Sequence, residues 1–309
     1  MAWPELSAER DGGTIATLHL VSQILGKTAV ALLPWRNHGW HATLHLHPRG
    51  LRTEPLHGEG GTFELGLDLV EGAVTFADSA GERRVPLRAA PVAELYAAVT
   101  AMLRAAGRAV RIHAVPNEID PAIAFAKDRR PRDYDPDSAA RLLEVLLAAD
   151  RIFRLFRSGF LGKVSPVHFF WGSFDLAVTR FSGRPAPLHP GGIPHLPDAV
   201  TREAYSHEVS SAGFWPGGAG MPGGPLFYSY AYPAPDGFAA AKAEPAAARF
   251  DQAMGEFVLD YEAVRSAPDP DAALLAFLRS TYAPAADLAR WDRAGLECEE
   301  GRPGVPRPV

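Results

Sequence analysis

Residues 160–183 read Phe160-Leu-Gly-Lys-Val-Ser-Pro-Val-His-Phe-Phe-Trp-Gly-Ser-Phe-Asp-Leu-Ala-Val-Thr-Arg-Phe-Ser-Gly183, and a weaker copy, Ile24-Leu-Gly-Lys-Thr-Ala-Val-Ala-Leu-Leu-Pro-Trp35, precedes them. In both stretches a tryptophan follows the lysine of Leu-Gly-Lys by eight residues, so Lys27 corresponds to Lys163 and Trp35 to Trp171. A helix-like run precedes each motif, strand-like runs follow it, and a second helical run closes the unit. Such self-similarity indicates an internal duplication.

The composition is that of a folded globular chain. It has 309 residues, of which 47% are hydrophobic and 10% aromatic, enough for two units of about 150 residues that each bury a core. We therefore predict an α+β fold in which two units, each helix, antiparallel sheet, helix, pack with pseudo-twofold symmetry. The predicted divisions are a first repeat with its linker, a second repeat and a loose tail, at 1–132, 133–296 and 297–309.

Charge and cysteine content exclude several classes of function. The net charge of −5, from 31 basic and 36 acidic residues, argues against a nucleic-acid partner. Cys298 is alone, which excludes an intrachain disulfide and a cysteine-based zinc site. The first residues lack a basic stretch followed by an apolar core, and no window approaches 18 uninterrupted apolar residues. We expect a cytoplasmic protein without a membrane partner, and the sequence leaves the oligomeric state open.

The first predicted helix runs from Ile15 to Gly26, behind a capping residue near Asp11. Its opposite side carries a row formed by His19, Gln23 and Lys27. A polar row this short is expected to face solvent, and the alternative is that it lines a site. A strand is predicted over 28–34 and another along Trp40–His47.

Later elements are predicted from the same patterns. Strands are expected at 62–69, 73–76, 83–87, 109–115, 174–178, 227–232 and 255–264. Helices are expected at 91–107, 138–158 and 269–282, with Pro284 stopping or kinking the last of them. Residues 116–136 are expected to link the two halves.

A long glycine- and proline-rich excursion occupies 185–197 and 216–225 and brackets 205–215. Such length without regular structure is uncommon unless the segment covers a site. Functional side chains concentrate in 205–215 and in two other segments, 35–41 and 168–180. We expect these three segments to converge.

Acid–base chemistry is the simplest use of these side chains. His207 or Glu208 would act as general acid or base, and Asp175 would orient it. The cationic side chains available to hold a substrate anion are Arg36, Lys163 and Arg180. The alternative is structural: Asp175 and Arg180 as an ion pair, and Lys163 as a surface charge at a helix end.

A divalent metal is a further hypothesis. His38 and His41, together with His207 or Glu208, would form a His/His/carboxylate ligand set. The competing interpretation is that these histidines lie in a turn or on a sheet surface. A serine triad within 206–211 is excluded because neighbouring strand residues point to opposite faces, and no Gly-x-Ser-x-Gly elbow occurs.

Aromatic residues suggest the walls of an organic-ligand pocket. The residues singled out as pocket walls or ligand contacts are His168, Trp171, Trp215 and Tyr230. Aromatic packing in the core is the alternative for each of them.

Four runs of this sequence resemble a bacterial family catalogued as a domain of unknown function (5996). They are Pro34-Trp-Arg-Asn-His38, Ser165 to Arg184, His189-Pro-Gly-Gly-Ile-Pro194 and Tyr205 to Gly218. The resemblance extends to about Leu296. It implies no activity, ligand or residue role.

Together these observations predict a small-molecule enzyme that uses His/Glu acid–base chemistry, with or without a metal, in an aromatic-lined pocket. The alternative is a non-catalytic module for small-molecule binding or self-assembly. An enzyme requires the polar groups of the three segments to converge within hydrogen-bond reach, whereas a binding module requires only an apolar cavity.

Overall fold

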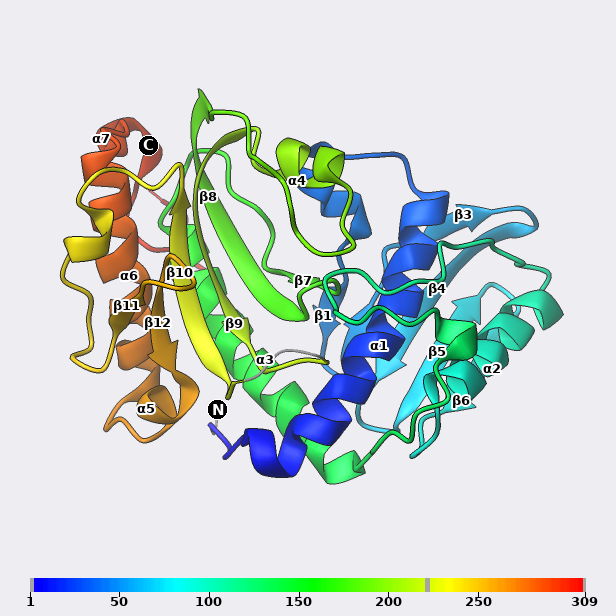
Figure 1. Ribbon diagram of the computed structural model, residues 1–309. Helices are drawn as coiled ribbons and strands as arrows, with labels where there is room; N and C mark the ends of the chain where they lie inside the picture. The colour runs from blue at the N-terminus through cyan, green and yellow to red at the C-terminus, as the bar shows by residue number, and fades with distance from the viewer. Residues whose placement is uncertain (1–2, 220–222, 308–309) are drawn as a thin grey trace.

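The computed structural model describes residues 3–219 and 223–307. Its first half contains two α-helices and one antiparallel sheet (Figure 1). The sheet has strand order β1-β2-β4-β5-β6, and β3 also pairs with β4. The elements are α1 (Ala8–Leu32), η1 (Asn37–Ala42), β1 (His45–His47), β2 (Gly50–Arg52), β3 (Leu56–Gly58), β4 (Gly61–Asp68), β5 (Ala73–Asp78), β6 (Gly81–Pro86), α2 (Val92–Ala105) and η2 (Phe125–Lys127).

The second half contains an antiparallel sheet of order β11-β12-β10-β9-β8-β7 with helices on one side. Its elements are α3 (Pro136–Ser158), β7 (His168–Phe170), β8 (Asp175–Pro185), α4 (Asp198–Ala204), β9 (His207–Trp215), β10 (Leu226–Tyr232), η3 (Phe238–Ala240), β11 (Arg249–Asp251), β12 (Glu256–Asp260), α5 (Tyr261–Arg265), α6 (Pro270–Leu288) and α7 (Arg293–Leu296). The predicted α+β class is confirmed, and both halves have the order helix, sheet, helix.

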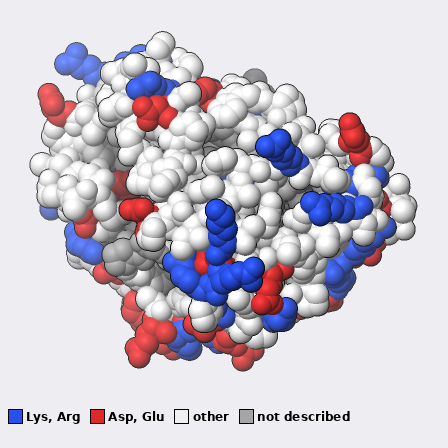
Figure 2. All heavy atoms as spheres, turned by 45° about the vertical axis from the view of Figure 1, so that its right-hand side comes forward, with Lys and Arg blue, Asp and Glu red and all other residues white. Residues whose placement is uncertain are grey.

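The two sheets meet at one isolated bridge. Leu44 and Phe169 exchange two backbone hydrogen bonds, of 2.9 and 2.8 Å. Helix α1 lies between the sheets, and α3 and α6 cover the far side of the second sheet (Figure 1). The surface in Figure 2 mixes basic and acidic side chains, with no broad area of one sign on that face.

Helix α1 is longer than predicted at both ends. Ser7 caps it and accepts a hydrogen bond from the Arg10 amide, and the helix passes through Gly26 to Leu32, so the strand predicted over 28–34 is wrong. Gly26 does not end the helix because its role is steric: a Cβ there would overlap the indole of Trp171. By length and mean hydropathy, 1.4, α1 could cross a membrane, but 78% of that window is buried in the fold, as for a core helix.

Other local predictions fail where packing overrides the local pattern. Residues 109–115 form no strand, and 261–265 form helix α5 instead of extending a strand. Helix α6 continues through Pro284 to Leu288, with Ala285 and Ala286 buried. In the excursion, 198–204 form α4 and 207–215 form β9, while its residues 220–222 lie outside the described part.

The second sheet has one apolar side and one polar side. Leu176, Phe214, Phe227 and Leu259 are fully buried on the apolar side, which faces α3 and α6. The opposite side carries polar and aromatic residues that alternate with these along the strands. We call this side the tyrosine face, and its members are Asp175, Thr179, Ser211, Tyr228, Tyr230, Tyr232 and Glu256.

Candidate functional site

The middle of the tyrosine face is built from small residues that lie beneath Tyr228. Tyr228 pairs with Gly213 and Gly213 with Ala177 across three strands. A Cβ at Gly213 would overlap the Tyr228 hydroxyl, so glycine lets this tyrosine lie flat across the sheet. The Tyr228 hydroxyl thereby reaches the carboxyl of Asp175.

Asp175 is a buried carboxyl that accepts two hydroxyl hydrogen bonds. Ser173 donates to its Oδ1, and Tyr228 donates to its Oδ2. Burial raises the pKa of Asp175, and the two hydroxyls oppose that rise because they stabilise the charged form.

Glu118 belongs to the segment between the two halves and lies against the turn that contains Gly172 and Ser173. A Cβ at Gly172 would overlap its Oε1, and Gly172 precedes the serine that binds Asp175. Burial, and then repulsion by Asp175, raise the pKa of Glu118 to about 7, while Lys27 lowers it. Glu118 has φ 60°, a conformation that non-glycine residues adopt at an energetic cost and that clusters at functional sites.

The polar row of α1 faces this site and not solvent. His19, Gln23 and Lys27 are all buried. His19 lies 2.8 Å from the carbonyl oxygen of Gly172, and the Lys27 amine donates to Asn117 Oδ1. Burial lowers the pKa of His19 to about 4 and that of Lys27 to about 8. The solvent-facing prediction for this row is therefore wrong, because the second half covers this side of the helix.

Aromatic side chains lie around Tyr230, at the end of the tyrosine face away from Asp175. The Tyr205 and Tyr230 hydroxyls are 2.8 Å apart, and the His189 ring stacks on Tyr205 at 4.8 Å. Glu256 lies on the neighbouring strand β12, and burial, followed by Asp175, raises its pKa to about 7. Tyr205, Tyr230 and Glu256 keep part of their surface accessible to solvent.

Two of the three segments predicted to converge, 35–41 and 205–215, contribute with Lys163 to a second cluster, beyond Phe181 on the same side of the sheet. The Lys163 amine lies 2.5 Å from Nε2 of His38, whose ring centroid is 5.7 Å from that of His207. His38 also packs against Trp40, at 5.3 Å.

Other predicted site residues lie apart from this cluster. Glu208 follows His207 in β9 and points the other way, accepting hydrogen bonds from Ser182 and Arg184. Arg36 forms an ion pair of 2.6 Å with Glu54.

The aromatic candidates are divided between these places. Trp171 donates from Nε1 to the Ala42 carbonyl, at 2.5 Å, and lies under the Lys27 amine. His168 is buried beside Trp40, and neither of its ring nitrogens has a partner in the described structure. Trp215 is half-buried at the Asp175 end of the tyrosine face.

The histidines proposed as metal ligands have other contacts. Nδ1 of His38 lies 2.9 Å from the Ala204 carbonyl oxygen, and the His41 ring packs on Trp35 at 4.7 Å. Over residues 3–219 and 223–307, no three His, Cys, Asp or Glu side chains are grouped so as to hold a metal ion. The turn interpretation describes the placement of both histidines in η1.

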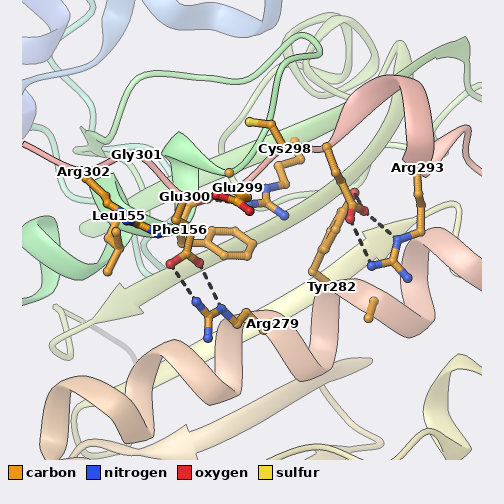
Figure 3. Close-up of a pocket in the computed structure, with 14 residues that line it drawn as sticks. Leu155, Phe156, Arg279, Tyr282, Arg293, Cys298, Glu299, Glu300, Gly301 and Arg302 are labelled. Atoms are coloured by element: carbon orange, nitrogen blue, oxygen red, sulfur yellow. Dashed lines mark hydrogen bonds and ion pairs between the residues drawn. The ribbon is translucent and has the colours of Figure 1, made fainter. Parts of the chain in front are cut away.

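Arg180 is on the apolar side of the sheet and lines a separate pocket of about 660 Å³ between α3, α6 and the C-terminal residues (Figure 3). Its guanidinium stacks on Phe156, 3.6 Å from the ring centroid. Arg279 binds Glu300 and Arg293 binds Glu297 across the pocket. The Arg279–Glu300 pair attaches residues 297–301 to α6, where the sequence predicted a loose tail, and Arg279, Arg293, Glu297 and Glu300 each have a partner of opposite charge.

Sequence reasoning missed Glu118, Tyr205, Tyr228 and Glu256. Glu118 is a single acidic residue in a proline-rich segment, and Glu256 begins an ordinary strand, so neither has a local signal. The alternation Tyr228, Tyr230, Tyr232 was visible in the sequence and is the one pattern that marks this face.

Comparison with known proteins identifies a family but no activity. No curated protein and no solved structure matches the chain. A family model described as a family of unknown function (DUF5996) matches residues 3–298. Because the match covers nearly all of the sequence, this chain belongs to that family, DUF5996.

Proposed function

We propose that the chain is an enzyme that acts on a small organic molecule by acid–base chemistry on the tyrosine face, with Glu118 and Asp175 as its proton-transferring groups. The observation that carries this proposal is the pKa of about 7 for Glu118, beside a second buried carboxyl. A general acid or base works best when its pKa is close to the working pH.

The two carboxyls have environments that suit different roles. Asp175 accepts two hydroxyl hydrogen bonds, which favour its charged form. The pKa of Glu118 is set by burial and by the charges of Asp175 and Lys27, which leave a carboxyl that can gain or lose a proton near neutral pH. Pairs of carboxyls with such different surroundings commonly divide the roles of acid and base.

The chemistry of the face selects the class of substrate. It offers carboxyl and hydroxyl oxygens and aromatic rings, which favour a hydroxylated or amine-bearing molecule over an anion. Two of the cations proposed to hold an anion are engaged elsewhere, since Arg36 pairs with Glu54 and Arg180 lies on the other side of the sheet. The helix, sheet, helix order of both halves agrees with an origin by duplication, although the first Leu-Gly-Lys motif lies inside α1 and the second follows α3.

The test is incubation of the purified protein with a mixture of small metabolites, followed by mass spectrometry of the solution and of the protein-bound fraction. We expect the wild type to consume at least one compound and Glu118→Gln to consume none. Glu144→Gln changes an exposed residue of α3 and should behave as wild type. A compound that is retained but never converted would favour the non-catalytic binding module. If the protein neither retains nor converts any compound, the result would contradict both the enzyme and the binding module.

A further inference from the structure

The Lys163 amine lies among two aromatic rings and a histidine. It is 4.8 Å from the centroid of the Phe181 ring and 5.6 Å from that of Trp40, and 2.5 Å from Nε2 of His38. Within the described residues this amine forms no ion pair with a carboxylate, although Glu203 lies near enough to favour its charged form. An amine packed on aromatic rings and facing a base is unusual for a surface charge.

The hydrogen bonds of His38 determine which of its nitrogens is the base. Nδ1 lies 2.9 Å from the Ala204 carbonyl oxygen, which can only accept, so Nδ1 carries the hydrogen and donates. Nε2 therefore has a free lone pair and accepts from the Lys163 amine. The ring is held in place because His38 is 5% exposed and its backbone amide donates to Glu203, at 2.9 Å.

We propose that Lys163 is a nucleophilic amine, activated by His38, that condenses with a small aldehyde or ketone to form an imine. A nucleophile in contact with a base that a third group orients is the arrangement used for covalent catalysis. Here the nucleophile is Lys163, the base is His38, and the orienting group is the carbonyl of Ala204.

The proposed step balances without any further reactant. The neutral amine of Lys163 attacks the carbonyl carbon, the carbonyl π pair moves to oxygen, and His38 Nε2 takes a proton from the attacking nitrogen. His38 returns that proton to the hydroxyl, which leaves as water while the nitrogen lone pair forms the C=N bond. The products are one imine and one water, and nothing is oxidised or reduced.

The electrostatic surroundings support a neutral amine. Burial lowers the pKa of Lys163, and Glu203 partly opposes that effect. Burial also lowers the pKa of His38, and the neighbouring Lys163 and His207 lower it further, while the hydrogen bond to Ala204 and the charge of Glu203 oppose the fall. Lys163, His38, Glu203 and His207 are the titratable side chains that face one another here.

The chain supplies its own controls, since it has four lysines. Lys127 and Lys242 are exposed, whereas Lys27 is buried and bonded to Asn117.

The test treats the whole protein at pH 7 with benzaldehyde and cyanoborohydride, which reduces an imine to a stable amine. Peptide mass spectrometry then gives the labelling rate of each lysine. We expect Lys163 to be labelled several times faster than Lys127 and Lys242, because a lowered pKa leaves more of its amine in the free, nucleophilic form.

Two variants separate reactivity from a merely structural contact. His38→Asn retains a residue type that tolerates the φ of 59° at this position, and it should slow the labelling of Lys163 without affecting Lys127 or Lys242. Lys163→Arg should abolish labelling at that position only. Equal rates for Lys163 and the two exposed lysines in the wild type would overturn the proposal, as would an unchanged rate in His38→Asn. The assay needs no substrate of the tyrosine face, so its outcome is independent of the proposed function.

Discussion

Gly26 and Trp171 are in direct contact, and the contact leaves no room for a side chain at Gly26. Gly26 belongs to the first copy of the Leu-Gly-Lys motif, and Trp171 is the tryptophan of the second copy. The two copies therefore contact each other in the fold. Trp35, the counterpart of Trp171 in the sequence, is 50% exposed and packs on His41. The two tryptophans therefore have different surroundings, and Trp171 serves to join α1 to the second half.

Gly26→Ala should destabilise the protein by about 1–3 kcal/mol, the usual cost of overpacking a well-packed interior. The added methyl group must displace the Trp171 indole, which also donates to Ala42. Urea unfolding would measure this change. Gly12→Ala is the matched control, because Gly12 lies in the same helix with no atom near the new methyl group, and alanine there should stabilise the helix by about 0.5–1 kcal/mol.

The contribution of Glu118 to stability should fall as the pH rises from about 4.5 to 7. Glu118 has a folded pKa of about 7 against an ordinary value of 4.5, so over this range the folded chain binds protons that the unfolded chain has released. The stabilisation is complete below pH 4.5 and is lost as the pH passes through the folded value. Urea unfolding across this range should show wild type and Glu144→Gln losing stability relative to Glu118→Gln as the pH rises. Asp175 and Lys27, which face Glu118, remain in all three proteins.

Gly172→Ala should lower the pKa of Glu118 towards its ordinary value. The new methyl group would occupy the position of the Glu118 carboxyl oxygen and push that carboxyl away from Asp175 and towards solvent. Carbon NMR of labelled glutamate carboxyls, followed through a pH titration, would show this shift. Gly224→Ala places a methyl group in open space, and a similar shift in that variant would argue against a local effect.

His168→Phe should raise the free energy of unfolding by about 1 kcal/mol at pH 7, because the variant removes two buried nitrogens that lack partners. The gain should grow as the pH falls below 6.5. Burial, then the charges of His45 and Arg157, lower the folded pKa of His168 to about 3, so the unfolded chain takes up a proton first and stability is lost. Unfolding at pH 7 and pH 5 measures both effects. His113→Phe, at an exposed position, should not reproduce them.

Glu297→Gln should destabilise the protein by about 1 kcal/mol, which is typical for a half-buried charged hydrogen bond. Its carboxylate accepts from the Tyr282 hydroxyl, at 2.8 Å, and from Arg293, at 2.6 Å. Thermal unfolding would measure the loss. Glu299→Gln changes an exposed neighbour and should leave the melting temperature unchanged. Equal effects of the two changes would mean that the ion pairs do not hold residues 297–301.

Much of the fold could be predicted because its signals are local. The helices at 92–105 and 136–158 and the strands at 61–68 and 226–232 follow from spacing and from caps at their own ends. Prediction failed at Gly26 and Pro284, residues that usually end helices. There, packing against distant segments determines the conformation, and no local pattern records that packing.

The candidate site was predicted in part. His38, Lys163 and His207 were named from the sequence, and the structure brings them together. Glu118 was not named, because its pKa depends on Asp175 and Lys27, which lie far from it in the chain. Glu208 was paired with His207 although alternation along a strand places neighbours on opposite faces, so that pairing could have been rejected from the sequence.

The sequence by itself determined the α+β class, most of the regular elements and the alternation that puts three tyrosines on one side of a strand. Each of these depends on the period of a helix or a strand, which neighbouring residues express directly. Only the tertiary structure decided that α1 turns His19, Gln23 and Lys27 inward and that Glu118 lies beside Gly172. Burial and the approach of charges are set by segments that meet in space, and they give these side chains their chemistry.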